Sequence, residues 1–196
     1  MNALTPTLDL APALIVLPGP KCAAADAAGA RTIRPPDARD MLERGPVLLA
    51  HAAMTARRLG LNAPPRAQGL LDVLELFAFV RPARFAAPSA AGLAMALGLP
   101  EPKGPEAQGL ALRAVSRLLL EELAAAPEPS REEALALAET LARAGWAWGA
   151  AAVAALRSAP VGNAFRSSGL DVWARIPEWE DGAPPGEAGT RPIEAE

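Results

Sequence analysis

The sequence predicts an α/β fold in which a small mixed sheet is layered with helices. The composition is globular, since 51% of the 196 residues are hydrophobic and 21% are charged. Short apolar runs with β-branched residues alternate with helical patterns in the first 80 residues, and the remainder follows helical patterns. This order is typical of a sheet covered by helices. The chain is long enough to bury one substantial core.

The first half supplies the expected strands. Residues 13–18 (ALIVLP) form an apolar run that ends at Pro-Gly-Pro, which predicts a buried strand and a turn. Residues 21–28 and 30–34 predict two further strands, with Gly29 as the hairpin turn. A short helix over 37–44 follows two prolines and ends at Gly45, and 46–50 predict another strand.

Helices are expected to dominate after residue 50. One helix runs to Leu59, and the next contains Leu74, Leu76, Phe77 and Val80. Ser89 is the expected N-cap of a helix over 90–97. The other expected helices cover 106–124, 130–144 (opened by a capping box) and 149–157. We divide the chain into an α/β domain (1–125), a helical extension (126–181) and an acidic, Pro/Gly-rich linker or tail (182–196).

The charge distribution is uneven although the net charge is only −3. Residues 31–90 carry nine arginines against five acidic residues, and residues 120–196 carry six against thirteen. The first half is therefore suited to a polyanion that the second half would repel. Ordinary solvated surface is the alternative explanation.

Several classes of chemistry lack their usual residues. The sequence contains no P-loop motif, and His51 and Cys22 are its sole histidine and cysteine. Neither a His- or Cys-based metal cage nor a disulfide within one chain is therefore expected, and we predict no cofactor and no metal. A Ser or Cys nucleophile that relies on His51 has no supporting context, and we interpret His51 as a structural residue at a strand end. The longest apolar stretch (144–156) is too short to span a bilayer, and the N-terminus lacks the basic region of a signal peptide, so we expect a cytoplasmic protein.

Residues 70–100 (LLDVLELFAFVRPARFAAPSAAGLAMALGLP) resemble a stretch of the DnaQ-like exonucleases. In that family a strand ends at an Asp, here Asp72, before a helix, a Pro-containing loop and a Ser-capped helix. Residues 46–61 resemble a second family segment, which contains a His-Asn pair. The whole pattern is similar to the N-terminal region of bacterial DinG-like ATP-dependent DNA helicases, and 169–181 (GLDVWARIPEWED) resemble the junction before their motor. The resemblance implies an RNase H-like fold with additional C-terminal helices.

The departures from the family pattern concern its catalytic carboxylates. DnaQ-like enzymes hold two metal ions with four carboxylates, the first two being Asp-x-Glu on the first strand. Here that strand is ALIVLP, the Asp of the second motif is replaced by Ala56, and Ala52 stands where the family has Asn. The last motif would fall at residues 107–113, which contain no acid. We therefore predict a degenerate exonuclease-like domain without a catalytic site.

Three functions follow as hypotheses. The first is a non-catalytic accessory module of an ATP-dependent DNA helicase, which binds or guides nucleic acid or packs on the motor domain of the same or a partner chain. Single-stranded DNA is its expected nucleic acid, contacted by the side chains most suited to phosphate: Arg57, Arg58, Arg81 and Arg84. The second is a nuclease with a rearranged acid set, namely Asp26, Asp72, Glu75 and Glu106. The third is a protein-interaction domain with no DNA role.

Aromatic side chains are expected to pack rather than to bind. Phe77, Phe79 and Phe85 lie in an apolar run, where core packing is the main expectation and base stacking the alternative. The tryptophans are expected to pack against the domain or a partner: Trp146, Trp148, Trp173 and Trp179.

Overall fold

The computed structural model describes residues 10–19, 21–65, 69–128 and 130–158. One five-stranded sheet has the order β3-β2-β1-β4-β5. Its strands are β1 (Ala13–Val16), β2 (Cys22–Asp26), β3 (Gly29–Ile33), β4 (Val47–Leu49) and β5 (Leu70–Asp72). Strands β1 to β3 pair antiparallel, whereas β4 is parallel to both β1 and β5. The predicted α/β class with a small mixed sheet is confirmed.

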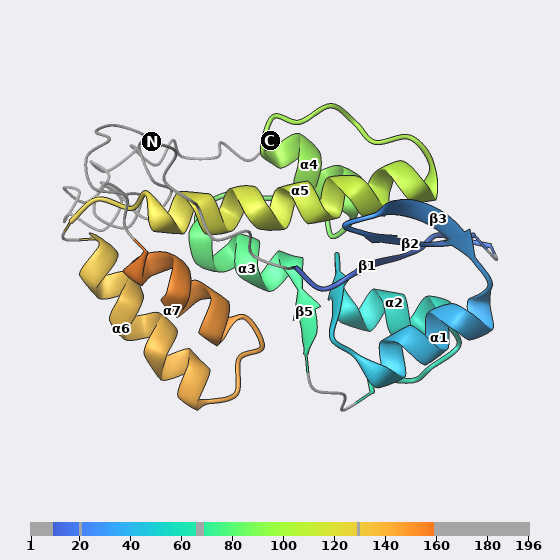
Figure 1. Cartoon of the computed structure of the whole chain (residues 1–196), viewed down its shortest axis with the longest axis horizontal. Coiled ribbons are helices and arrows are strands. Elements are labelled where there is room, and N and C mark those ends of the chain that lie inside the picture. The colour runs from blue at the N-terminus through green and yellow to red at the C-terminus, as the bar shows by residue number, and fades with distance from the viewer. Residues whose placement is uncertain (1–9, 20, 66–68, 129, 159–196) are drawn as a thin grey trace, which may run out of the picture.

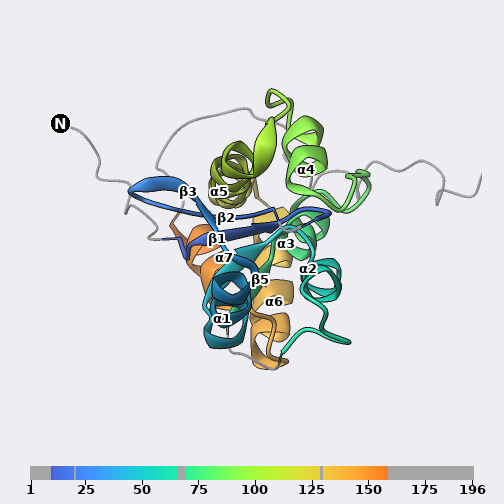
Figure 2. The same ribbon diagram turned by 90° about the vertical axis from the view of Figure 1, so that its right-hand side faces the viewer.

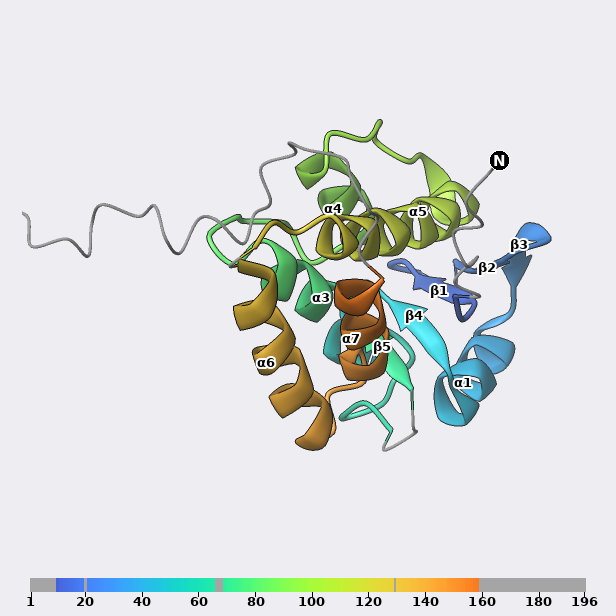
Figure 3. The same cartoon turned by 60° about the vertical axis from the view of Figure 1, so that its left-hand side comes forward.

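Helices cover both faces of this sheet. They are α1 (Pro35–Arg44), α2 (Ala52–Arg58), α3 (Val73–Val80), α4 (Ala90–Ala96), α5 (Gly104–Ala124), α6 (Ser130–Arg143) and α7 (Gly149–Arg157). Figures 1 and 2 show α4 and α5 on one side of the sheet and α1 on the other. Figure 3 shows α6 and α7 side by side beside α3, below the end of α5.

The alternation of side chains along each strand explains why the strands are apolar throughout. Ala13 and Ile15 belong to the core under α5, whereas Leu14 and Val16 belong to the core under α1 and α2. Successive side chains of a strand point to opposite faces, so a strand buried on both faces has no polar position. All four residues of β1 are at most 5% exposed.

Helix α5 lies very close to the sheet because small residues line the contact. A Cβ placed on Gly109 would lie 2.8 Å from Cβ of Ala25 and 3.7 Å from Cγ1 of Ile15. The alanines of β2 therefore leave room for the helix, and Gly109 lets its backbone reach them. The contact is apolar on both sides.

The expected elements are found within a few residues of their predicted ends. The hairpin between β2 and β3 differs, because Ala27 and Ala28 form its turn, and Gly29, the expected turn residue, pairs with Asp26 as the first residue of β3. The carboxylate of Asp26 accepts the Ala28 N–H at 2.9 Å and thereby stabilises this turn.

The helical extension shares its core with the α/β part. Trp148 and Leu156 are nearly or fully buried in the same cluster as Ala13 and Phe77. The hydrophobic core therefore continues across residue 125, where we placed a domain boundary. Among the described residues, none of the helices combines the length and the apolar character that a membrane-spanning helix needs. The tail (182–196) and the segment 169–181 lie outside the described residues.

Candidate functional site

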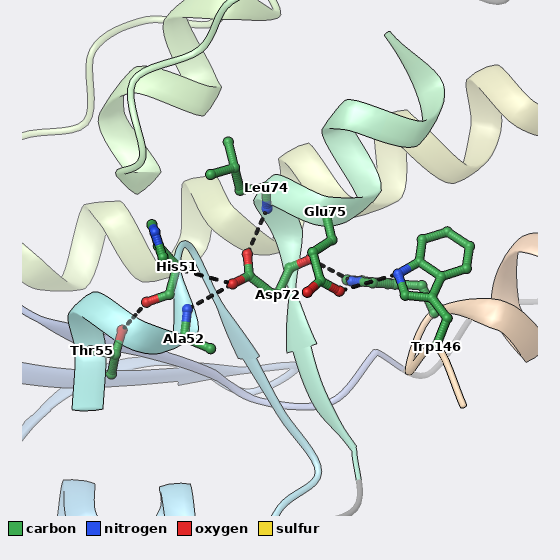
Figure 4. A network of polar contacts seen from close by, with 8 residues as sticks. His51, Ala52, Thr55, Asp72, Leu74, Glu75 and Trp146 are labelled. Atoms are coloured by element: carbon green, nitrogen blue, oxygen red, sulfur yellow. Dashed lines mark hydrogen bonds and ion pairs between the residues drawn. The ribbon is translucent and has the colours of Figure 1, made fainter. Parts of the chain in front are cut away.

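Asp72 is the centre of a polar network at the carboxyl end of the parallel strands (Figure 4). It is the last residue of β5 and the N-cap of α3, where its Oδ1 accepts the Leu74 N–H at 3.0 Å. Its Oδ2 accepts the Ala52 N–H at 2.7 Å, at the start of α2. One carboxylate, only 8% exposed as a residue, therefore holds the first turns of two helices.

His51 lies beside this carboxylate, two residues after β4. Its Nδ1 is 3.9 Å from Asp72 Oδ2, which is too long for a hydrogen bond, and this buried nitrogen has no hydrogen-bond partner. The His51 carbonyl accepts the hydroxyl of Thr55 at 3.0 Å and thereby belongs to the first turn of α2. The predicted position of His51 at a strand end is confirmed.

Two tryptophans from the segment between α6 and α7 complete the network. Trp148 Nε1 donates to the Asp72 carbonyl at 2.7 Å, and Trp146 Nε1 donates to Glu75 Oε2 at 3.2 Å. The ring of Trp146 also packs on Phe79, with 5.0 Å between ring centroids. Both tryptophans pack against the domain, as we expected.

The electrostatics of this network disfavour charge on both acids. Burial raises the pKa of Asp72, although the N–H groups of Ala52 and Leu74 and the nearby His51 act in the opposite direction. Burial and the neighbouring charge of Asp72 raise the pKa of Glu75, against the hydrogen bond from Trp146. The two carboxyl groups therefore hold protons more tightly than free side chains do.

This arrangement stabilises the fold rather than forming a metal cage. Within residues 10–19, 21–65, 69–128 and 130–158, no three His, Cys, Asp or Glu side chains are grouped as metal ligands. Asp72 already has a backbone N–H on each of its oxygens.

The other two members of the rearranged acid set are engaged elsewhere. Asp26 forms an ion pair with Arg31 at 2.9 Å in the β2–β3 hairpin, and Glu106 accepts the Thr32 hydroxyl. Only Asp72 and Glu75 are neighbours. The structure therefore gives the rearranged nuclease no support.

The positions that correspond to the exonuclease carboxylates are occupied by packed apolar residues. All of β1 is buried, and Ala56 is 0% exposed in the same cluster as Leu14 and Val16. Residues 107–113 belong to α5, where Gly109 and Leu112 face the core. The two-metal site of the resembled family does not fit these residues, because none of them carries a carboxylate.

The four predicted phosphate-binding arginines lie at or shortly after the ends of two different helices. Helices α2 and α3 begin on either side of Asp72 and run in different directions, and Arg57 and Arg58 lie at the far end of α2 (Figures 1 and 4). Arg58 Nη1 donates to the Val16 carbonyl at 2.7 Å. Arg57 is exposed, with no hydrogen bond or ion pair among the described residues.

Arg81 and Arg84 lie after the end of α3 and also differ from each other. Arg81 donates to Glu122 Oε2 from Nε at 3.0 Å and from Nη2 at 2.9 Å, and so joins α3 to α5. Arg84 is exposed, and its side chain has no partner within the described ranges. Arg57 and Arg84 are thus the two predicted contact residues that are exposed and whose side chains make no hydrogen bond or ion pair among the described residues.

The expectation that the phenylalanines pack in the core is correct for two of them. Phe77 is 1% exposed, and Phe79 packs on Trp146, but Phe85 is 88% exposed. The prediction of core packing for Phe85 is wrong, because Phe85 lies in the loop after α3 rather than on its buried face. A signal was present in the sequence, since residues 81–84 (RPAR) separate Phe85 from the apolar run that ends at Val80.

Two open hollows lie at the opposite edge of the sheet. They share Pro12 and Pro46, at the amino ends of β1 and β4, and Met41 of α1, and their volumes are about 340 and 770 Å³. None of the four predicted arginines lines either hollow.

Comparisons of the chain with protein-family models, curated proteins and solved structures give no match.

Proposed function

We propose that this chain is a non-catalytic accessory module of a cytoplasmic ATP-dependent DNA helicase, built on an RNase H-like, exonuclease-type fold. Its role is to bind or guide single-stranded DNA, or to pack on the motor domain. Three antiparallel strands followed by two parallel ones make the kind of small mixed sheet that the sequence resemblance implies.

The observation that carries this proposal is the first strand. The resembled enzymes keep two metal-binding carboxylates there, whereas Ala13–Val16 is buried on both faces by aliphatic residues. A carboxylate introduced into this core would need to be neutral or paired. The fold has therefore kept a strand-end Asp that holds two helices and lost the acids that would hold metal.

The exposed arginines support a role in contacting phosphate. Arg57 and Arg84 are exposed, and residues 31–90 carry the excess of positive charge. Phosphate contacts of this kind supply affinity that depends on salt. Arg58 and Arg81 support the fold through the Val16 carbonyl and Glu122 instead.

Fluorescence anisotropy of a labelled single-stranded oligonucleotide, titrated with the full chain at low and moderate salt, tests the proposal. We expect binding that weakens with salt and weakens further in Arg57→Ala and Arg84→Ala. Arg117→Ala is the matched control, because Arg117 is an exposed arginine engaged with Glu121 on α5. An absence of binding even at low salt would contradict the DNA role and favour packing on a protein partner.

A further inference from the structure

Phe85 is the most exposed large hydrophobic side chain in the described part of the protein, at 88%. The others are Met95, Leu110 and Leu137, at about half exposure each. All three of these lie on helices, whereas Phe85 lies in the loop between α3 and α4. Figure 3 shows this segment at the rim of the molecule.

The loop that carries Phe85 is anchored on both sides. Before it, Arg81 is held by Glu122, and its Nη1 lies 3.4 Å from the Ala96 carbonyl at the end of α4. The Arg84 N–H donates to the Arg81 carbonyl at 3.0 Å, which closes a turn immediately before Phe85. The exposed ring therefore follows a fixed turn.

The part of the loop that follows Phe85 is equally constrained. Ala86 is 9% exposed, and the Ser89 N–H donates to the Ala87 carbonyl at 2.7 Å. Ser89 caps α4, and a Cβ on Gly92 would lie 2.5 Å from the Ala87 carbonyl oxygen. The loop thus packs tightly against the first turn of α4. Binding through Phe85 would require little ordering of the loop backbone.

The loop segment that contains Phe85 carries only positive charges. Residues 81–89 (RPARFAAPS) contain two arginines and no acid. Glu122 pairs with Arg81, whereas the Arg84 guanidinium, next to Phe85 in sequence, is exposed and makes no hydrogen bond or ion pair in the described ranges. An exposed guanidinium and an exposed aromatic ring on consecutive residues match a ligand that carries both negative charge and a flat π-face.

We propose that Phe85 and Arg84 form a contact site for single-stranded nucleic acid, in which the Phe85 ring stacks on an unpaired base and Arg84 binds an adjacent phosphate. The site rests on the proposed nucleic-acid role and names where the contact is made. Base–aromatic stacking is tolerant of sequence because every base has a π-face. The site therefore requires bases as well as phosphates, but not a particular sequence.

The test compares a short labelled oligothymidylate with a strand of the same length in which every base is replaced by an abasic site. Anisotropy titrations use the full chain and four variants: Phe85→Ala, Phe85→Trp, Arg84→Ala and the control Leu137→Ala, which removes an exposed apolar side chain on α6. Circular dichroism melting confirms that each variant folds, which we expect because Phe85, Arg84 and Leu137 are exposed.

We expect the protein to bind the base-bearing strand roughly tenfold more tightly than the abasic strand. Phe85→Ala should abolish this preference, whereas Phe85→Trp and Leu137→Ala should keep it. Arg84→Ala should weaken binding to both strands and lower the slope of log affinity against log salt by about 0.7.

Two results would overturn the inference in different ways. Equal binding of both strands, or an unchanged preference in Phe85→Ala, would exclude the stacking site but leave DNA binding by other residues intact. No binding of either strand would overturn the stacking site together with the nucleic-acid role of the chain.

Discussion

The carboxylate of Asp72 lies between the N–H groups of Ala52 and Leu74, which begin α2 and α3. The carbonyl of the same residue accepts the indole N–H of Trp148, 76 residues further along the chain. One residue thus connects β5 to three helical segments. The strand-end position of Asp72 was predictable from the sequence through its family resemblance. Its partners were not, because no local pattern links an Asp to a Trp so far away.

Glu75 gives this network a pH dependence. Its pKa is raised in the folded protein, by burial and by the charge of Asp72. Because the folded state holds this proton more tightly than the unfolded chain, Glu75 contributes stability that is present in acid and is lost as pH rises past its folded pKa.

We predict that Glu75→Gln removes this loss of stability at higher pH, because the amide does not titrate. The amide oxygen can still accept a hydrogen bond from the Trp146 indole N–H. Relative to the natural protein, the free energy of unfolding of the variant should rise between about pH 4 and neutral pH. Urea unfolding at a series of pH values measures the difference. A difference that stays constant with pH, or falls as pH rises, would show that Glu75 is not perturbed in the folded state.

At the scale of elements, the helices are joined to one another by a few side chains with fixed partners. Arg81 donates to the Glu122 carboxylate from both Nε and Nη2, and both side chains are mostly buried, at 26% and 17% exposure. The Arg117–Glu121 pair lies on the same helix α5 with side-chain exposures of 66% and 55%. The first pair joins α3 to α5, whereas the second lies within one helix.

Arg81→Ala should destabilise the protein by about 2 kcal/mol, because it removes the guanidinium that donates to the largely buried Glu122 carboxylate. Arg117→Ala should change the free energy of unfolding by less than about 0.5 kcal/mol, since exposed ion pairs contribute little. Denaturant titrations of both variants at the same pH make the comparison. Equal losses in the two variants would contradict the structural role of Arg81.

The elements themselves were largely predictable, for physical reasons that operate locally. The apolar run of β1, the two prolines that begin α1 and the Ser89 cap of α4 act within a few residues of their positions. Arg81 and Phe85 were not predictable to the same extent. The use of Arg81 depends on Glu122, 41 residues away, and the exposure of Phe85 depends on where α3 ends.

At the scale of the whole molecule, one core joins the sheet to the C-terminal helices. Trp148 is 0% exposed and belongs to the same cluster as Leu48 of the sheet and Leu119 of α5. Helix α7 is therefore expected to unfold together with the sheet rather than as a separate unit. The boundary that we placed at residue 125 separated the exonuclease-like part from the helices that follow it, and the order of elements along the chain carries no information on shared packing.

A variant with Trp173→Phe and Trp179→Phe isolates the fluorescence of Trp146 and Trp148. Its fluorescence and far-ultraviolet circular dichroism should change at the same denaturant concentration. A fluorescence transition that precedes the loss of circular dichroism would instead indicate that α6 and α7 detach first.

The described residues form a five-stranded mixed sheet covered by helices, with aliphatic packing where the exonuclease-like fold that we propose would have its metal ligands. The rearranged acids do not replace them, because Asp26 and Glu106 pair with Arg31 and Thr32 instead. The chain is accordingly expected to contact nucleic acid without cleaving it.

The most direct test is to incubate the full chain with end-labelled single- and double-stranded DNA in Mg²⁺ or Mn²⁺, with EDTA as the control, and to measure strand length on a denaturing gel. We predict the same strand lengths with metal as with EDTA. Cleavage that requires the metal and is lost in Asp72→Asn would contradict the account and assign a catalytic role to the network around Asp72.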